Sequence, residues 1–73
     1  MNKMKYYRRE KNLTLKQLSS ITNISVGYLC HLENGSRNNP SMNVLNKIAY
    51  ALNKSVEEIF FNWYANNSYF GAL

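Results

Sequence analysis

Apolar residues recur at helical spacing along the middle of the chain. Leu15, Leu18 and Ile21 form one apolar stripe, which begins directly after Thr14. Thr14 and the glutamine three residues later make a T-x-x-Q capping box, in which each side chain satisfies a backbone N–H of the other residue. The pattern predicts a short amphipathic helix that starts after Thr14 and ends at Asn23, because asparagine tolerates the left-handed conformation that reverses the chain.

A second short helix is predicted directly after this turn, over residues 26–34. Ser25 is its expected cap, and Leu29 and Leu32 lie three residues apart on the side that faces a core. Gly35 follows, where glycine commonly ends a helix. Two short helices joined by a tight turn are the means by which many proteins place a helix in the major groove of DNA.

The pattern predicts three further helices and no strand. The first runs from Asn2 to Lys11, with Met4 and Tyr7 facing inward. Residues 34–39 (NGSRNN) hold too many turn formers for regular structure and are predicted as a polar loop. The fourth helix follows this loop, and residues at the i, i+3, i+4 and i+7 spacing form its apolar face: Leu45, Ile48, Ala49 and Leu52.

The fifth helix is predicted to start at Ser55, which forms a second capping box with Glu58. Its apolar stripe continues past residue 61 and includes Val56, Ile59, Phe60, Trp63 and Tyr64. This continuation favours a long fifth helix and leaves more aromatic surface than one small core buries. A small domain that exposes such a patch risks aggregation, so a second copy of the chain is expected to cover the last four of these residues.

Charge adds one indication to this pattern. Nine Lys and Arg oppose four acidic residues in the 73-residue chain, for a net charge of +5. The basic residues gather near the N-terminus: Lys3, Lys5, Arg8, Arg9 and Lys11. Such an excess suggests a polyanionic partner, although a solvated helix face is the commoner explanation for this feature alone.

Several other classes of protein are disfavoured. A single cysteine, Cys30, excludes an internal disulfide, and one histidine leaves no metal cluster of the usual spacing, so no metal or cofactor is expected. The glutamates are scattered, aspartate is absent and no Gly-rich phosphate loop occurs, so we do not expect an enzyme. The start MNKMKYY lacks the apolar run of a signal peptide and no stretch approaches membrane-spanning length, which favours a cytoplasmic protein.

The order and spacing of these segments resemble the helix-turn-helix domains of the phage repressor and Cro proteins, also called the xenobiotic-response-element family. The resemblance covers roughly residues 3–61 and is carried by Arg8 and the segments LTLKQLS, YLCHLENGSR, NPS and VLNKIAYALNKSVEEIF. It implies an all-α, compact, five-helix lambda-repressor-like DNA-binding domain over residues 1–61. Residues 62–73 would then be an aromatic C-terminal extension that contributes to a dimer contact.

Helical geometry and this resemblance together select the residues that would read bases. With Leu29 and Leu32 inward, the opposite side and the start of their helix face the groove. The expected base contacts are Ser25, Val26, Gly27, Tyr28 and His31. Several relatives carry glutamines where this chain has Val26 and Gly27, so a methyl contact to thymine and a close backbone approach are expected there instead.

Two of these residues keep alternative explanations. Tyr28 either contacts a base, or packs its ring on Leu32 or Leu15 and offers only its hydroxyl to a phosphate, and the pattern favours neither. His31 is either a DNA contact or a solvated surface histidine, and its place on the outward face favours the contact. A neutral imidazole can hydrogen-bond guanine N7, whereas the protonated form would bind a phosphate.

Phosphate contacts are expected on either side of the reading helix. The N-terminus of the helix after Thr14 attracts anions through its unpaired N–H groups and its dipole, although Leu15 replaces a phosphate-binding glutamine of many relatives. The loop after residue 33 combines amides with a guanidinium and no acid. The expected phosphate contacts are Thr14, Lys16, Asn34, Ser36, Arg37 and Asn38.

Glu33 is an acid on a helix expected to face DNA, where its charge would repel phosphates. By resemblance, Arg8 reaches Glu33 and forms a partly buried ion pair that joins two helices. The alternative is an exposed glutamate without a partner. The ion pair is favoured, and Arg8 is therefore not counted among the DNA contacts.

Taken as a set, these features favour a small stand-alone transcriptional regulator. It is expected to be a repressor that binds a pseudo-palindromic operator in double-stranded DNA as a homodimer, similar to Cro proteins or to the controller proteins of restriction–modification systems. The alternative is a protein-interaction module, an antitoxin or antirepressor that masks a partner protein with its C-terminal aromatic helix. Leu15, Val26 and Gly27, which replace family glutamines, favour that alternative.

Overall fold

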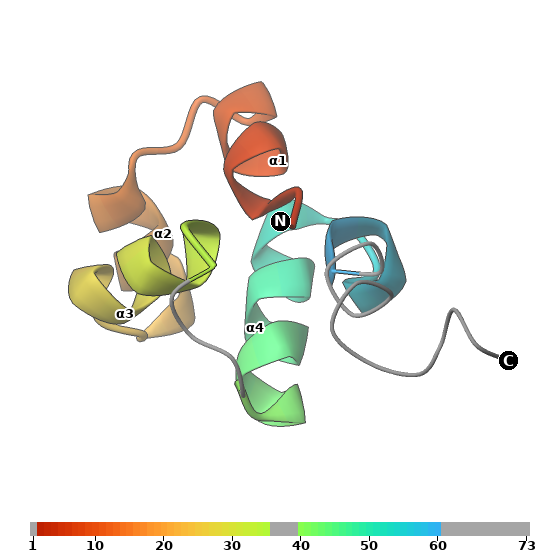
Figure 1. Ribbon diagram of the computed structural model, residues 1–73. Coiled ribbons are helices and arrows are strands. Elements are labelled where there is room, and N and C mark those ends of the chain that lie inside the picture. The colour runs from red at the N-terminus through yellow and green to blue at the C-terminus, as the bar shows by residue number, and fades with distance from the viewer. Residues whose placement is uncertain (1, 36–39, 61–73) are drawn as a thin grey trace, which may run out of the picture.

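The described part of the chain is built from helices. A computed structural model describes residues 2–35 and 40–60. The helices are α1 (Met4–Glu10), α2 (Leu15–Thr22), α3 (Val26–Glu33) and α4 (Met42–Leu52), and residues 56–60 are also helical. Figure 1 shows α2 and α3 on one side of α4 and the helical residues 56–60 on the other, with α1 at one end of the group. The predicted all-α, lambda-repressor-like fold is confirmed, and the described ranges contain no strand.

The capping residues predicted for α2 and for the helical residues 56–60 are confirmed. The Gln17 backbone N–H donates to Thr14 Oγ1 at 3.0 Å, and the Thr14 N–H donates to Gln17 Oε1 at 2.8 Å. Asn23 ends α2 in the left-handed conformation, with φ 60°. At the start of the fifth helix, the Ser55 backbone N–H donates to the Glu58 carboxylate at 2.8 Å and thereby lowers the pKa of that carboxyl below its ordinary value.

The first helix is shorter than predicted, because Asn2 and Lys11 lie outside it. Asn2 instead acts through its side chain: Oδ1 accepts from the Met4 backbone N–H at 3.0 Å, and Nδ2 donates to the Leu32 carbonyl at 2.9 Å. The second of these bonds joins the beginning of α1 to the end of α3. The predicted inward position of Met4 is confirmed, since its side chain is fully buried.

One hydrophobic core holds the helices together. It contains the predicted inward faces of α3 and α4, with Leu18 of α2 and Met4 of α1. The core members are Met4, Leu18, Leu29, Leu32, Leu45, Ile48, Ala49, Leu52, Ile59 and Phe60. Among the described residues, no helix is long and apolar enough to cross a membrane.

The burial of Ile59 and Phe60 corrects the predicted dimer interface. Both side chains are almost completely buried in the core, and the Ile59 carbonyl accepts from the Lys3 backbone N–H at 2.8 Å. A side chain enclosed by its own chain cannot present its surface to a second copy, so these two residues do not belong to that interface. Trp63 and Tyr64, the other two, lie outside the described residues.

The predicted inward position of Ile21 is also wrong, since this residue is 57% exposed. Thr22 occupies the buried position instead, four residues after Leu18. Its hydroxyl donates to the Leu18 carbonyl at 2.8 Å and accepts from the backbone N–H of Ile24 at 3.3 Å. At 100° per residue, Thr22 lies between Leu15 and Leu18 on the helix surface, whereas the spacing of three residues carries Ile21 away from them.

Candidate nucleic-acid interface

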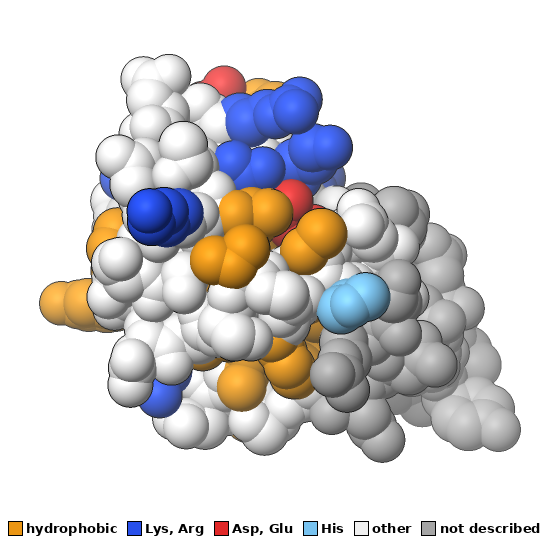
Figure 2. All heavy atoms as spheres, turned by 90° about the vertical axis from the view of Figure 1, so that its left-hand side faces the viewer, with side chains coloured by type: hydrophobic (Ala, Val, Ile, Leu, Met, Phe, Trp, Pro, Cys, Tyr) orange, Lys and Arg blue, Asp and Glu red, His pale blue; other side chains and the backbone are white. Residues whose placement is uncertain are grey.

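The outward side of α3, together with its cap residue Ser25, presents most of the residues predicted to read bases. Ser25, Val26, Gly27 and His31 are exposed, and Val26 is 41% exposed. Tyr28 is half-buried and packs against the core, which supports the packing role for its ring. Figure 2 shows the face of the molecule that carries the histidine, with exposed hydrophobic side chains beside it and Lys and Arg side chains above. A surface of this kind combines methyl groups and polar groups that can contact base edges with cations that can contact phosphates.

Local hydrogen bonds define the start of α3. Ser25 Oγ accepts from the Tyr28 backbone N–H at 3.1 Å, so its hydroxyl hydrogen remains available to an acceptor on a base or phosphate. Gly27 has open space around it: an added Cβ would meet no heavy atom within 4 Å. Its φ is not positive, unlike that of Gly35, so the backbone does not require glycine at this position.

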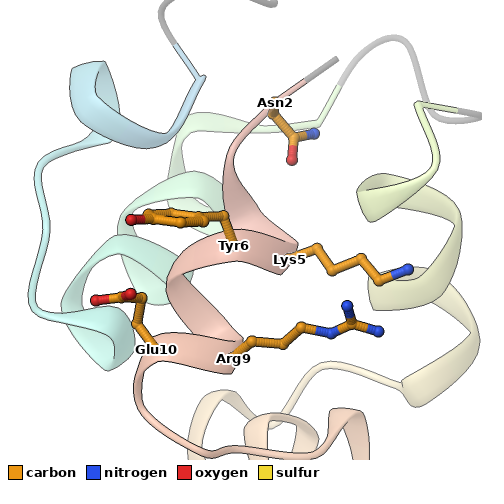
Figure 3. A pocket seen from close by; sticks show the side chains of 5 residues that line it. All are labelled: Asn2, Lys5, Tyr6, Arg9 and Glu10. Carbon is orange, nitrogen blue, oxygen red and sulfur yellow. The ribbon is translucent and has the colours of Figure 1, made fainter.

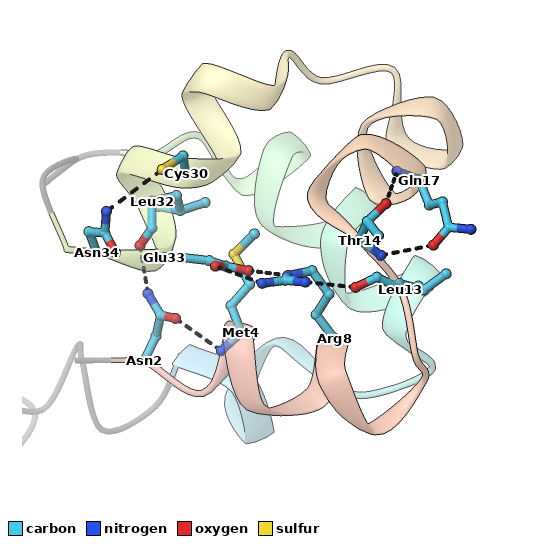
Figure 4. A network of polar contacts seen from close by, with 10 residues as sticks. All are labelled: Asn2, Met4, Arg8, Leu13, Thr14, Gln17, Cys30, Leu32, Glu33 and Asn34. Atoms are coloured by element: carbon cyan, nitrogen blue, oxygen red, sulfur yellow. Dashed lines mark hydrogen bonds and ion pairs between the residues drawn. The ribbon is translucent and has the colours of Figure 1, made fainter.

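An ion pair at the other end of α3 connects this helix to α1. Arg8 Nε donates to Glu33 Oε2 at 2.6 Å, and Nη2 donates to Oε1 at 3.3 Å (Figure 4). Arg8 Nη1 also donates to the Leu13 carbonyl at 2.6 Å, so one guanidinium contacts both α3 and the loop before α2. The side chains of Arg8 and Glu33 are only 11% and 4% exposed. The pair neutralises the acid and fixes the position of α3 relative to α1.

The predicted phosphate contacts fall into two groups. Thr14 and Lys16 are exposed at the start of α2, and the Thr14 hydroxyl accepts from a backbone N–H while keeping its own hydrogen. Asn34 is exposed at the end of α3, where its Nδ2 lies 3.7 Å from Cys30 Sγ. The other three predicted contacts, Ser36, Arg37 and Asn38, lie outside the described residues.

Two cations next to this surface were not identified from the sequence as contacts. Lys5 and Arg9 are exposed on α1, on the side that faces α3. Their spacing of four residues places them on one helix face. This spacing is the feature of the sequence that could have identified them as contacts. In the described part of the chain, no group of three or more His, Cys, Asp or Glu side chains is arranged to hold a metal ion.

Comparison with known proteins identifies the fold independently. A family model described as helix-turn-helix matches residues 4–59. The chain is 32% identical over 57 residues to two HTH-type transcriptional regulators of Bacillus subtilis (strain 168), SinR and SlrR, and to SinR of Bacillus licheniformis. These matches cover 78% of this chain, 51% of either SinR protein and 38% of SlrR, so the chain spans about half the length of these relatives or less. No solved structure matches.

Proposed function

The chain belongs to the Cro/C1-type helix-turn-helix family, and from this we propose that it is a sequence-specific transcriptional regulator of the repressor type. It binds a pseudo-palindromic operator in double-stranded DNA as a homodimer. The observation that carries this proposal is the exposed start of α3. The inward side of this helix packs in the core, and its last turn is held by the ion pair between Arg8 and Glu33. Such a rigid, outward helix is what reading base edges in the major groove requires.

The contacts divide by the chemistry that each residue offers. Ser25 and His31 supply hydrogen bonds to base edges, and Val26 supplies a methyl surface for a thymine. Thr14, Lys16, Asn34 and Arg37 bind phosphates on either side of the groove. The phosphate contacts set the orientation of the domain, and the base contacts select the sequence.

Selection of bound sequences from random duplex DNA tests this function. A two-fold symmetric consensus is expected, because a homodimer presents two copies of α3 to two half-sites. Recovery of a consensus without symmetry would contradict the dimer, and recovery of no consensus would favour the protein-interaction module.

Replacing Gly27 should change the stability of the protein and its affinity for DNA in opposite directions. Glycine in a helix is less favourable than alanine by about 0.5–1 kcal/mol, and the space around Gly27 accepts a side chain. Replacing Gly27 with alanine is therefore expected to raise the free energy of unfolding. The same variant is expected to bind the selected operator more weakly, by roughly tenfold or about 1.4 kcal/mol, because a methyl group prevents close approach of the α3 backbone to the bases. Chemical denaturation and fluorescence anisotropy measure the two effects.

The control for this prediction is Asn46→Ala at an exposed position of α4. It is expected to leave operator affinity unchanged. A Gly27→Ala protein that is more stable and binds the operator as tightly as the wild type would show that the α3 backbone does not approach the bases at this residue.

For the dimer, we propose a contact built from residues 62–73 and centred on Trp63 and Tyr64. The two copies of α3 must lie about 34 Å apart, one turn of DNA, and aromatic side chains are enriched at the centre of such contacts. Replacing Trp63 with alanine is expected to give a folded protein that sediments as a monomer at micromolar concentration, where the wild type sediments as a dimer. Its affinity for the operator should fall more than its affinity for random DNA.

Trp63→Tyr is the matched variant, since it keeps an aromatic ring and should retain most of the dimer. An alanine variant that is unfolded, or a wild type that is monomeric and still binds a symmetric site cooperatively, would rule out this contact.

A further inference from the structure

We propose that Lys5 and Arg9 of α1 form a second phosphate-binding surface, which contacts the DNA backbone beside the stretch that α3 reads. This inference rests on the proposed function and extends its footprint to a helix outside the helix-turn-helix pair. The ligand is the phosphodiester backbone, so the contact carries no sequence preference.

The two cations point in the same direction. Lys5 and Arg9 are four residues apart, which places them on one face of α1. In Figure 3 both side chains extend toward α3, whereas those of Tyr6 and Glu10 extend to the opposite side of the helix. These four residues and Asn2 line an open hollow on the surface. The side chain of Glu10, the acid that lines this hollow, therefore points away from Lys5 and Arg9.

The position of the two cations relative to α3 is defined by bonds on either side of Lys5. Before it, the side chain of Asn2 donates to the carbonyl of Leu32 at the end of α3. After it, Arg8 pairs with Glu33 on the last turn of the same helix. Lys5 lies between these two anchors and Arg9 directly follows the second, so α1 cannot rotate its cations away from α3 without breaking one of them.

Neither of these two cations is held in an ion pair within the described residues. In residues 2–35 and 40–60, the single ion pair joins Arg8 to Glu33, and neither Lys5 nor Arg9 takes part in it. Two like charges one helical turn apart repel each other, so an anion between or above them is stabilised. Figure 2 shows Lys and Arg side chains on the same face as the histidine, with hydrophobic side chains between them. A duplex that lies against the reading face would therefore also face these cations, which favours the DNA backbone over an acidic protein as the ligand.

The residue that follows α1, Lys11, offers a matched control. Lys11 is also exposed, but it lines a separate hollow with Tyr7, Glu10 and Lys54, on the side of the end of α4. Lys11→Gln removes one positive charge from the residue directly after α1 and leaves the face of α1 toward α3 unchanged. Any effect of net charge alone is therefore shared by Lys11→Gln and Lys5→Gln.

The experiment measures the affinity of each protein for a short fluorescent duplex of random sequence by anisotropy, from about 50 to about 200 mM KCl. Lys5→Gln and Arg9→Gln are each expected to reduce the slope of log affinity against log salt by about 0.9 per bound chain. The double variant loses two contacts, so the ratio of wild-type to variant affinity should fall roughly twelvefold over this salt range. Thermal melts of all variants confirm that the fold is retained.

The outcomes distinguish this inference from the function on which it rests. Reduced slopes for Lys5→Gln and Arg9→Gln, with the wild-type slope for Lys11→Gln, support the phosphate surface. The same slope in all four proteins, or an equal reduction in all three variants, overturns it and leaves DNA binding in place. A wild type that does not bind the duplex would instead refute the proposed function.

Discussion

Replacing Glu33 with glutamine is expected to lower the free energy of unfolding by about 3–5 kcal/mol. The substitution keeps the shape of the side chain but leaves the Arg8 guanidinium buried without its counter-charge. Arg8 would then face an amide that accepts one hydrogen bond and places a donor beside its second N–H. A domain of this size has a total stability of roughly 4–11 kcal/mol, so the variant should melt far below the wild type.

Glu57→Gln is the control, because Glu57 is an exposed carboxylate near the end of the described chain. Its removal is expected to change stability by less than about 0.5 kcal/mol. A double variant, Arg8→Met with Glu33→Leu, should recover much of the loss, since apolar replacement of a whole buried pair is often neutral or stabilising. A Glu33→Gln melt that matches the wild type would show that the ion pair contributes nothing to stability.

Replacing Phe60 with alanine is expected to destabilise the protein by about 3–5 kcal/mol, because it opens a cavity in the core. Phe60 is the largest of the fully buried side chains and lies at the last described position. Phe60→Leu, which leaves a smaller void, should cost less and keep the domain folded for measurement. Urea denaturation of the three proteins gives the ranking.

The control for Phe60 is Tyr50→Ala, which removes an aromatic ring that is 89% exposed on α4. This change should be nearly silent. If Phe60 were instead part of a contact between two copies, Phe60→Ala would lower the melting temperature mainly through its dependence on protein concentration. A shift that is the same at low and high concentration would confirm the core position.

Local chemistry made much of the fold predictable from the sequence. The Thr14 capping box, the Ser25 cap and the left-handed Asn23 each act within a few residues of their own position, so the sequence contains the whole interaction. The apolar spacing of α3 and α4 was equally informative, because each of these helices packs one continuous stripe on the core. The ion pair between Arg8 and Glu33 joins residues distant in the chain, and only a resemblance to known domains predicted it.

The residues misassigned from the sequence are Ile21, Ile59 and Phe60. In each case the burial of the side chain depends on contacts that a local pattern does not contain. Ile21 and Thr22 are neighbours, and hydrophobicity favoured the wrong one because the hydroxyl of Thr22 is satisfied by hydrogen bonds that exist only once the turn has formed. Ile59 and Phe60 extend an apolar stripe, and periodicity cannot distinguish a stripe that closes its own core from one that binds a second copy.

The order of the described helices, the caps of α2 and α3 and the outward side of α3 could be predicted from the sequence, because these features depend on interactions between near neighbours. The tertiary structure alone decided that Ile59 and Phe60 complete the core and that Asn2 bonds to Leu32. It also decided that Lys5 and Arg9 lie beside α3. These features depend on how separate helices meet, and burial is a property of the whole assembly of side chains that no local pattern contains.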